Sequence, residues 1–185
     1  FQVTGLNAGE TLAVKRAASA GAQTIGTLRF NAAPVEVFET RDGFGRIVFQ
    51  EANGWVPLSS LAVLPIGTVI GTKLPQGLMC VGTEPFWSAE IVGTDVVHFE
   101  TAEGLRITHE ITASGGFEAR PNADFLWLEA EANHASMSVR RTLCSDGMSD
   151  RDYPMFVDLV LRGRLAGQDS ASALTGCCFR PVEEK

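Results

Sequence analysis

Short runs of alternating apolar and polar residues recur along this chain of 185 residues, and glycine or Asn-Gly separates many of them. A spacing of two is typical of a β-strand with one buried face, whereas the spacing of an amphipathic helix is weak throughout. The runs are rich in β-branched and aromatic residues, which favour strands. We therefore predict an all-β protein. The predicted strands cover residues 25–28, 35–38, 46–49, 55–58, 87–91, 96–99, 105–111, 125–128, 135–139 and 156–161, with one 3₁₀ turn in 58–61.

Charge and cysteine divide the chain at the same place. Residues 1–66 carry five basic and five acidic side chains, so the net charge of −7 resides entirely in the remainder, which also holds all four cysteines. Proline and glycine punctuate the segment between. We predict a domain over 1–66, a linker over 67–77 and a domain over 78–185, the second an antiparallel β-barrel or sandwich.

The acidic balance restricts the partners. A net charge of −7 repels phosphate backbones, so we predict no nucleic-acid partner. The longest apolar stretch, around residues 61–71, contains Pro65 and Gly67 and is too short to span a bilayer, so we predict no transmembrane segment.

The cysteines point to an oxidising compartment. Cys80, Cys144, Cys177 and Cys178 form an even set without the close pairs of a zinc site. Adjacent cysteines form a strained ring if bridged to each other, and on a strand their side chains point to opposite faces. We favour Cys144–Cys177 with Cys80–Cys178, and the swapped pairing stays open. The chain begins at Phe1 with no initiator Met and no charged-then-apolar signal pattern. We expect a mature exported, periplasmic protein whose signal has been removed; a shortened chain is the alternative.

The first part resembles a known family. Its motifs follow the order and spacing of the bacterial SH3-like domain over residues 3–64, at Val3–Leu6, Leu12–Lys15, Ile25–Leu28, Val35–Val37, Gly43–Ile47 and Gly54–Leu61. The resemblance implies a small β-barrel and a cell-wall-associated setting. Phe44 replaces the family's usual tryptophan and Ser60 a tyrosine, at positions where family members often hold a peptide. Phe44 and Trp55 are the candidate ligand contacts, and a core-edge role is preferred for Trp55.

The second part resembles a family of uncharacterised bacterial envelope proteins that also carry an SH3-like domain in front. The resemblance rests on Cys80–Trp87, Cys144–Pro154 and Gly176–Cys178. It implies an envelope location and no particular activity.

Two polar segments supply the candidate binding residues. The loop after Cys144 contains Asp146, Asp150 and Arg151. As a binding loop, Arg151 would hold a carboxylate and the two aspartates an amine or cation. The preferred interpretation is a tight turn in which these side chains bond to the loop's own backbone. Glu84, Phe86 and Trp87 join a carboxylate to two aromatics at a strand start, a cluster that more often closes a barrel than catalyses. If both cysteine segments pair with residues 177 and 178, the two polar segments approach each other. Arg151 then has Glu84 or an incoming carboxylate as partner.

Histidine and metal chemistry receive little support. His98 and His109 fall on neighbouring predicted strands, but two imidazoles without a third ligand are more often exposed polar positions. We predict no metal, no cofactor and no catalytic residue, because the sequence contains no nucleophile elbow, phosphate loop or Cys–His dyad.

These features favour a non-enzymatic periplasmic binding protein whose SH3-like domain docks cell-wall peptide or an envelope protein. The alternative is an inhibitor or chaperone-like partner of an envelope hydrolase, since the disulfide-tied second part is acidic. An enzyme is the least favoured class.

Overall fold

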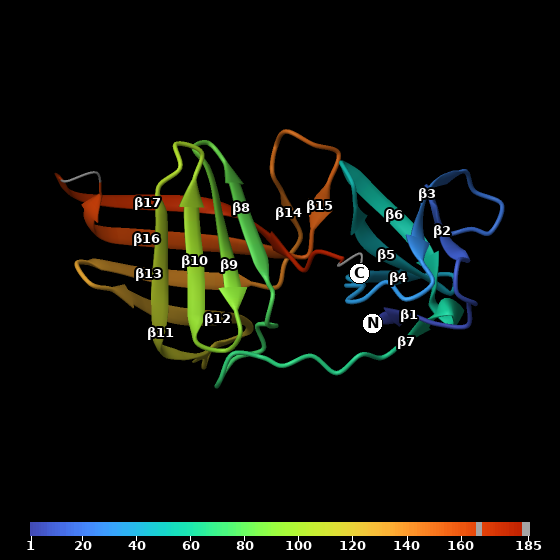
Figure 1. Cartoon of the computed structure of the whole chain (residues 1–185), viewed down its shortest axis with the longest axis horizontal. Helices are drawn as coiled ribbons and strands as arrows, with labels where there is room; N and C mark the ends of the chain where they lie inside the picture. The colour runs from blue at the N-terminus through green and yellow to red at the C-terminus, as the bar shows by residue number, and fades with distance from the viewer. Residues whose placement is uncertain (166–167, 183–185) are drawn as a thin grey trace. The chain divides into compact units, whose positions relative to one another are not determined.

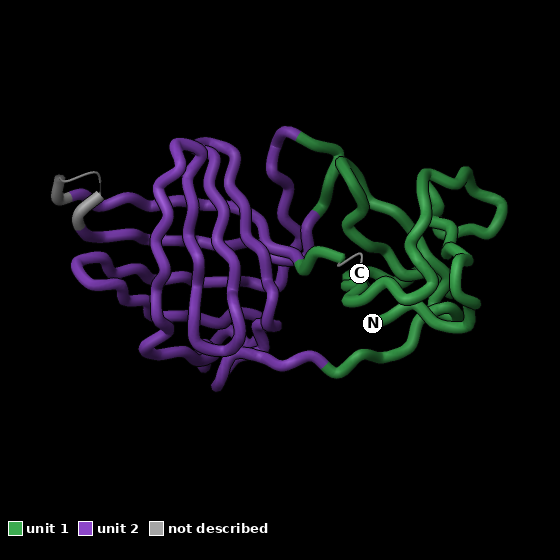
Figure 2. Tube along the Cα trace, in the orientation of Figure 1, with its two compact units in different colours: residues 1–65, 149–152, 180–185 green, residues 66–148, 153–179 purple. Residues whose placement is uncertain are grey.

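The computed structural model describes residues 1–165 and 168–182 and divides into two compact units. Unit 1 contains Phe1–Pro65, the short segment Ser149–Asp152 and the residues from Arg180 on; unit 2 contains Ile66–Met148 and Tyr153–Phe179. Figure 2 colours the two units and shows that unit 1 takes up three separate stretches of the chain.

Unit 1 is built from short antiparallel strands (Figure 1). Five of them form a sheet in the order β3-β2-β6-β5-β4, and β1 pairs with β7. A 3₁₀ turn, η1, precedes β7, as predicted. The elements are β1 Gln2–Val3, β2 Thr11–Lys15, β3 Thr24–Arg29, β4 Glu39–Arg41, β5 Phe44–Phe49, β6 Ala52–Pro57, η1 Leu58–Ser60 and β7 Leu61–Ala62.

Alternation along these strands builds the core of unit 1. Leu12 and Val14 on β2 are buried together with Ile47 on β5 and Val56 on β6. Their neighbours Arg46 and Trp55 lie on the opposite face of the β5–β6 pair, because successive side chains of a strand point to opposite faces. This opposite face carries the polar contacts described below.

Unit 2 is a closed antiparallel barrel of eight strands in the order β10-β11-β12-β13-β16-β17-β8-β9, which confirms the all-β fold class (Figure 1). Two further short strands, β14 and β15, pair with each other. The strands are β8 Met79–Thr83, β9 Phe86–Val92, β10 Val96–Thr101, β11 Arg106–Phe117, β12 Arg120–Ala130, β13 Asn133–Arg140, β14 Cys144–Ser145, β15 Asp152–Tyr153, β16 Met155–Leu165 and β17 Gln168–Phe179.

The barrel interior is filled by alternate side chains of its strands. Leu126 and Leu128 of β12, Met137 of β13 and Leu159 of β16 are all at most 2% exposed. Trp87 of β9 joins this core and packs against Phe99 with ring centroids 6.1 Å apart. The interior is therefore a packed core rather than an open ligand chamber.

Glycine makes room for the Trp87 indole. A side chain at Gly82 would overlap the indole nitrogen, and one at Gly176 would come within 2.9 Å of Trp87 Cζ2 and would meet the carbonyl of Val81. Trp87, at the end of the Glu84–Trp87 motif, therefore has a structural role: its indole fills the space left by Gly82 and Gly176, which have no side chain.

Two disulfides tie β17 to neighbouring segments. Cys80 of β8 is bonded to Cys178, and Cys144 of β14 is bonded to Cys177. The favoured pairing is confirmed, and the swapped one is wrong. Disulfides of this kind are typical of proteins in an oxidising compartment, such as exported ones.

The structure departs from the sequence-based division in three places. Val69 and Leu74 of the expected linker 67–77 are fully buried in the core cluster of the barrel, because burying apolar side chains against this interior removes them from water. Ser149–Asp152 and the residues from Arg180 on belong to unit 1, although we expected them in the domain 78–185. The last three residues of that range lie outside the described residues.

One predicted strand is absent. Residues 35–38 form no ladder, although Val35 is fully buried. The backbone N–H of Val35 donates to the carbonyl of Phe1 and that of Phe38 to the carbonyl of Arg46. These isolated bonds satisfy the N–H groups of Val35 and Phe38 without a continuous partner strand.

No helix in the described part of the chain has both the length and the apolar character that crossing a membrane requires.

Candidate functional site

A polar hollow of about 420 Å³ lies in unit 2, beside the Cys144–Cys177 disulfide. It is lined by the end of β8 and the residues after it, by the segment that begins at Cys144, and by β17. Glu84 and Asp146 both line it, so the two polar segments singled out in the sequence share one pocket.

Hydrogen bonds hold the segment after Cys144 in a tight turn. The Ser145 hydroxyl accepts from the backbone N–H of Gly147 at 3.3 Å, and Asp146 Oδ1 accepts from that of Met148 at 3.0 Å. Gly147 has φ +73°, a conformation that favours glycine. Asp146 therefore forms an Asx turn that stabilises the loop.

Further contacts fix Asp146 to the barrel. Its Oδ2 accepts a hydrogen bond from the buried Tyr153 hydroxyl at 3.1 Å, and its backbone carbonyl accepts one from the Thr83 hydroxyl at 3.0 Å. The carboxylate of Glu84 is exposed at the same hollow. Two carboxylates that share one hollow suit an ammonium group or a cation as ligand.

The two aromatics of this motif separate. Phe86 is 55% exposed, whereas Trp87 is 5% exposed and is held in the barrel core. Trp87 therefore positions the strand and has no surface to offer a ligand, contrary to its inclusion among the candidate ligand contacts.

Arg151 and Asp150 lie in the Ser149–Asp152 segment, which is part of unit 1. The guanidinium of Arg151 lies 2.8 Å from the carboxylate of Glu51. The sequence left Glu84 or an incoming carboxylate as the partner of Arg151, and the structure places Glu51 against it. Asp150 is exposed.

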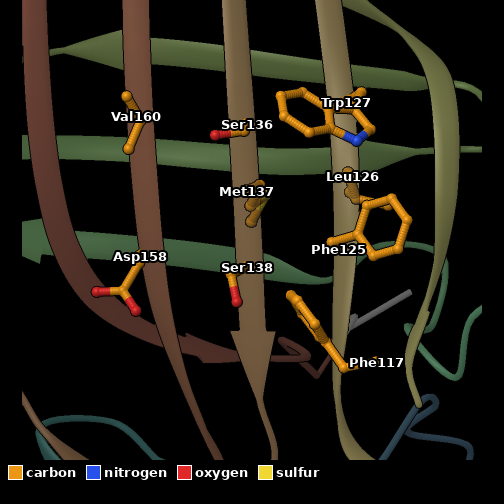
Figure 3. Close-up of a pocket in the computed structure, with 9 residues that line it drawn as sticks. All are labelled: Phe117, Phe125, Leu126, Trp127, Ser136, Met137, Ser138, Asp158 and Val160. Carbon is orange, nitrogen blue, oxygen red and sulfur yellow. The ribbon is translucent and has the colours of Figure 1, made fainter. Parts of the chain in front are cut away.

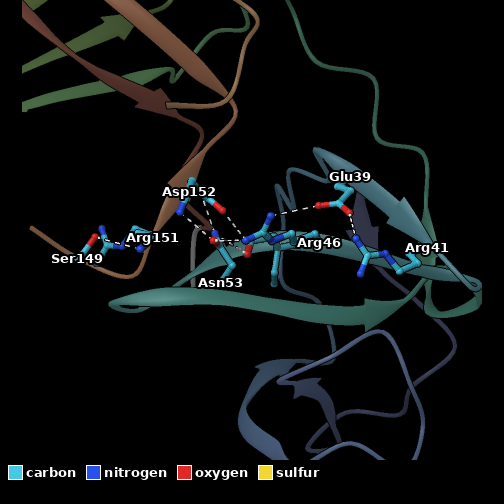
Figure 4. Close-up of polar contacts among 8 residues, drawn as sticks. Glu39, Arg41, Arg46, Asn53, Ser149, Arg151 and Asp152 are labelled. Carbon is cyan, nitrogen blue, oxygen red and sulfur yellow. Dashed lines mark hydrogen bonds and ion pairs between the residues drawn. The ribbon is translucent and has the colours of Figure 1, made fainter. Parts of the chain in front are cut away.

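Asp152, next in the chain, is held by three polar contacts from the β5–β6 pair (Figure 4). The Asn53 amide accepts from the backbone N–H of Asp152 and donates to its carbonyl, both at 2.8 Å. Arg46 Nη2 lies 2.6 Å from Asp152 Oδ2. We call Arg46 and Asn53 the clamp.

The clamp is itself held in place. Arg46 also donates to Asn53 Oδ1 at 3.0 Å and to Glu39 at 3.1 Å, and Glu39 accepts from Arg41 at 2.7 Å. Phe38 lies under the Arg46 guanidinium, 5.4 Å from it. Such a network sets the orientation of the guanidinium before a carboxylate arrives.

The other two aromatic candidates lie near the clamp. Trp55 is cross-strand partner of Arg46 but is only 7% exposed, with Arg41 stacked 5.3 Å from its ring. Its structure agrees with the core-edge role. Phe44 is half-buried and is paired with Pro57.

The histidines do not form a pair. His98 pairs with Thr108 and is exposed, whereas His109 pairs with Val97 and is fully buried. The two rings therefore lie on opposite faces of the sheet, and the expectation that His109 is exposed was wrong. Burial, followed by the charge of His134, lowers the pKa of His109. Within residues 1–165 and 168–182, no three His, Cys, Asp or Glu side chains are placed to hold a metal ion.

Sequence reasoning missed Arg46, Glu51 and Asn53. No local signal marks them, because the residues they bind are about 100 positions away along the chain. Arg46 and Asn53 lie on the polar face of the β5–β6 pair, and Glu51 lies in the turn between the two strands.

The chain matches no family model, and no curated protein or solved structure is similar to it by the same comparisons.

Proposed function

We propose that this chain is a non-enzymatic binding protein of the bacterial envelope, and that unit 1 is an SH3-like module that docks peptide. The observation that carries the proposal is the clamp, which binds a segment of this chain through backbone and side chain together. The Asn53 amide satisfies both backbone groups of one residue, and Arg46 adds a carboxylate contact. These are the elements of peptide recognition: main-chain bonds for affinity, side-chain pairs for specificity.

The arrangement of unit 1 supports the SH3-like assignment. A short five-stranded sheet, a 3₁₀ turn and a last short strand follow one another along residues 11–62, in the range where the motifs resemble that family. The disulfides support the exported location.

The ligand preference follows from the clamp. Arg46 selects a carboxylate, and Glu51, which pairs with Arg151, selects a cation one residue earlier. We therefore propose that the ligand is a peptide with an Arg-Asp or Lys-Asp step, from a cell-wall peptide or an envelope protein. Ser149–Asp152 occupies the clamp as an internal version of this ligand.

The proposal is tested with the labelled peptide Ser-Asp-Arg-Asp-Tyr and the full chain. Asp152→Ala weakens the internal occupant, so we expect it to bind the peptide about tenfold more tightly than the unsubstituted chain, because a competing segment reduces the available fraction of sites. Adding Arg46→Met to Asp152→Ala should abolish that gain. The control is Glu100→Ala, which breaks an exposed ion pair with Arg106 in unit 2. Equal peptide affinity for Asp152→Ala and the unsubstituted chain, both folded by circular dichroism, rejects peptide docking at the clamp.

The acidic hollow of unit 2 favours a second function, inhibition of a basic envelope hydrolase. Residues 67–185 carry 10 basic and 17 acidic side chains, and Glu84 presents an exposed carboxylate at the hollow. A basic partner surface would complement it. Lysozyme, a basic wall hydrolase, serves as the probe: Glu84→Gln should weaken inhibition, and Glu131→Gln, another exposed acidic residue of unit 2, should not. Absence of inhibition by the unsubstituted chain rejects this function for that enzyme class.

A further inference from the structure

A groove runs along the outer face of the barrel, over β13. The outward side chains of β13 include Ser136 and Ser138, and those of the flanking strands are larger. Trp127, Ser136 and Val160 lie on one cross-strand line, since Trp127 pairs with Ser136 and Ser136 with Val160. Small side chains between two large ones leave a hollow between walls.

The same arrangement repeats on the next line. Phe125 pairs with Ser138, and Ser138 pairs with Asp158. The two serines therefore form the floor of a hollow of about 310 Å³, walled by aromatic rings on the β12 side and by Asp158 and Val160 on the β16 side (Figure 3). Phe117 extends the aromatic wall and meets Phe125 edge-on at 5.6 Å.

The groove continues past Trp127. A second hollow of about 330 Å³ shares Trp127, Ser136 and Val160 with the first and reaches the line of Glu129, His134 and Arg162. The two hollows make one continuous groove that spans three cross-strand lines. Lines two residues apart along a strand are about 6.6 Å apart, so the groove is long and narrow.

The aromatic wall is open to solvent. Trp127 is 56% exposed and Val160 47%, and large apolar side chains that gather on an outer face mark an interaction site. Polar groups lie between and around the apolar side chains: the hydroxyls of Ser136 and Ser138 on the floor, and Asp158, Glu129, His134 and Arg162 on the rims. A ligand for this groove needs flat apolar faces and many hydroxyl groups along its edges.

We propose that the groove binds a linear, uncharged glycan of β-1,4-linked, gluco-configured sugars. Such sugars present axial C–H groups on both ring faces, which stack on Trp127 and Phe125, while their equatorial hydroxyls lie at the edges. Ser136 and Ser138 each donate and accept a hydrogen bond, and Asp158 retains acceptor sites beside its 2.8 Å ion pair with Arg140. Successive rings of the chain meet successive members of the aromatic wall.

Other classes of ligand fit less well. A peptide strand cannot extend this sheet, because the barrel is closed and offers no free edge at β13. Single-stranded nucleic acid also stacks on aromatic rings, but it requires a positively charged groove, and this chain carries a net charge of −7. The glycan site lies in unit 2 and does not depend on peptide docking by unit 1.

The test is calorimetric titration of the full chain with cellohexaose and with hexa-N-acetylchitohexaose, each up to about 10 mM. We expect binding of at least one of these β-linked chains, none of α-linked maltohexaose, and a loss of at least about tenfold in affinity for Trp127→Ala. Trp127→Phe should restore part of the affinity because it keeps a stacking ring. The control is Phe86→Ala, since Phe86 is equally exposed on the same unit but outside the groove.

Three results would overturn the proposal. One is that neither β-linked hexasaccharide binds the folded chain. Another is that Trp127→Ala, with an unchanged circular dichroism spectrum, keeps full affinity. The third is a concentration-dependent dimer in sedimentation that Trp127→Ala dissociates, because a second copy of the chain would then occupy the groove.

Discussion

Arg46 Nη2 lies 2.6 Å from Asp152 Oδ2, although 106 positions separate the two residues along the chain. The pair is half-buried, with the Arg46 side chain 21% exposed and that of Asp152 41%. Ser149–Asp152 belongs to unit 1 and not to the barrel that precedes and follows it in sequence, and this contact is one of those that join the segment to unit 1. The coupling free energy between Arg46 and Asp152 can be measured in a double-mutant cycle.

A double-mutant cycle of Arg46→Met and Asp152→Ala should return a coupling of about 0.5–1 kcal/mol, at the upper end for partly exposed pairs because the guanidinium is already oriented by Glu39. The free energy of unfolding in urea provides the measurement. The exposed Arg106–Glu100 pair is the matched control and should show a coupling near zero. Equal couplings for the two pairs would show that orientation adds nothing.

Gly82→Ala should destabilise the barrel by about 1–3 kcal/mol, because the added methyl group overlaps the Trp87 indole inside a packed core. Thermal or urea unfolding of unit 2 reports the loss. Gly116→Ala is the control, since its nearest contact would be an ordinary 3.6 Å from Asp124. An equally small loss of stability for Gly82→Ala and Gly116→Ala would show that Gly82 is not needed to make room for the Trp87 indole.

The buried His109 should make the protein less stable in acid. Its pKa is lowered in the folded state, so the unfolded chain takes up a proton first as pH falls below the ordinary value of 6.5. Stability is therefore fully present above pH 6.5 and declines below it, down to the folded-state pKa. Both ring nitrogens lack a hydrogen-bond partner among the described residues, and His109→Leu should remove this decline.

Urea midpoints at pH 8, 6 and 5 check the expectation for His109. The advantage of His109→Leu over the unsubstituted chain should grow as pH falls. His98→Leu, on the exposed face of the same strand pair, should show no such growth. Parallel pH profiles for His109→Leu and the unsubstituted chain would contradict it.

Glu36 should have the opposite effect on pH dependence in unit 1. Burial raises its pKa to about 7, while its hydrogen bond from the backbone N–H of Arg180, at 2.7 Å, opposes the rise. The folded state then keeps a proton that the unfolded chain releases above its ordinary value of 4.5, so stability declines as pH rises from 4.5 to about 7. Glu36→Gln should flatten this decline in urea unfolding followed at unit 1. An unchanged slope would place the carboxyl in a more solvated state.

The two disulfides should differ in their contribution to stability. Cys80–Cys178 closes a loop of 98 residues and both cysteines are fully buried, whereas Cys144–Cys177 closes one of 33. Replacing either pair with alanine should cost about 3–5 kcal/mol, with the larger cost for Cys80 and Cys178. Unfolding of the two double variants gives the order. The reverse order would mean that the entropy of the closed loop does not decide which disulfide stabilises the protein more.

The fold class, and the need of Cys177 and Cys178 for separate disulfide partners, could be predicted from the sequence. Alternation predicted ten strands, and nine of them form, because successive side chains of a strand point to opposite faces and a buried face therefore recurs every second residue. The adjacent Cys177 and Cys178 had to face opposite sides, so each needed its own partner. This reasoning excluded a bond between the two but left two pairings open, and only the structure shows which of them forms.

The positions of the candidate sites depend on strand order and register and could not be predicted from the sequence. Ser136 and Ser138 read as ordinary outward positions, and only the register of β12, β13 and β16 places them between Trp127 and Val160. Asp152 could not be matched with Arg46, nor Arg151 with Glu51, because nothing local records which distant segment will lie against a strand pair. Local periodicity determines the face of the strand on which a side chain lies. Its neighbours across the sheet depend on strand order and register, which are set only when the whole chain has folded.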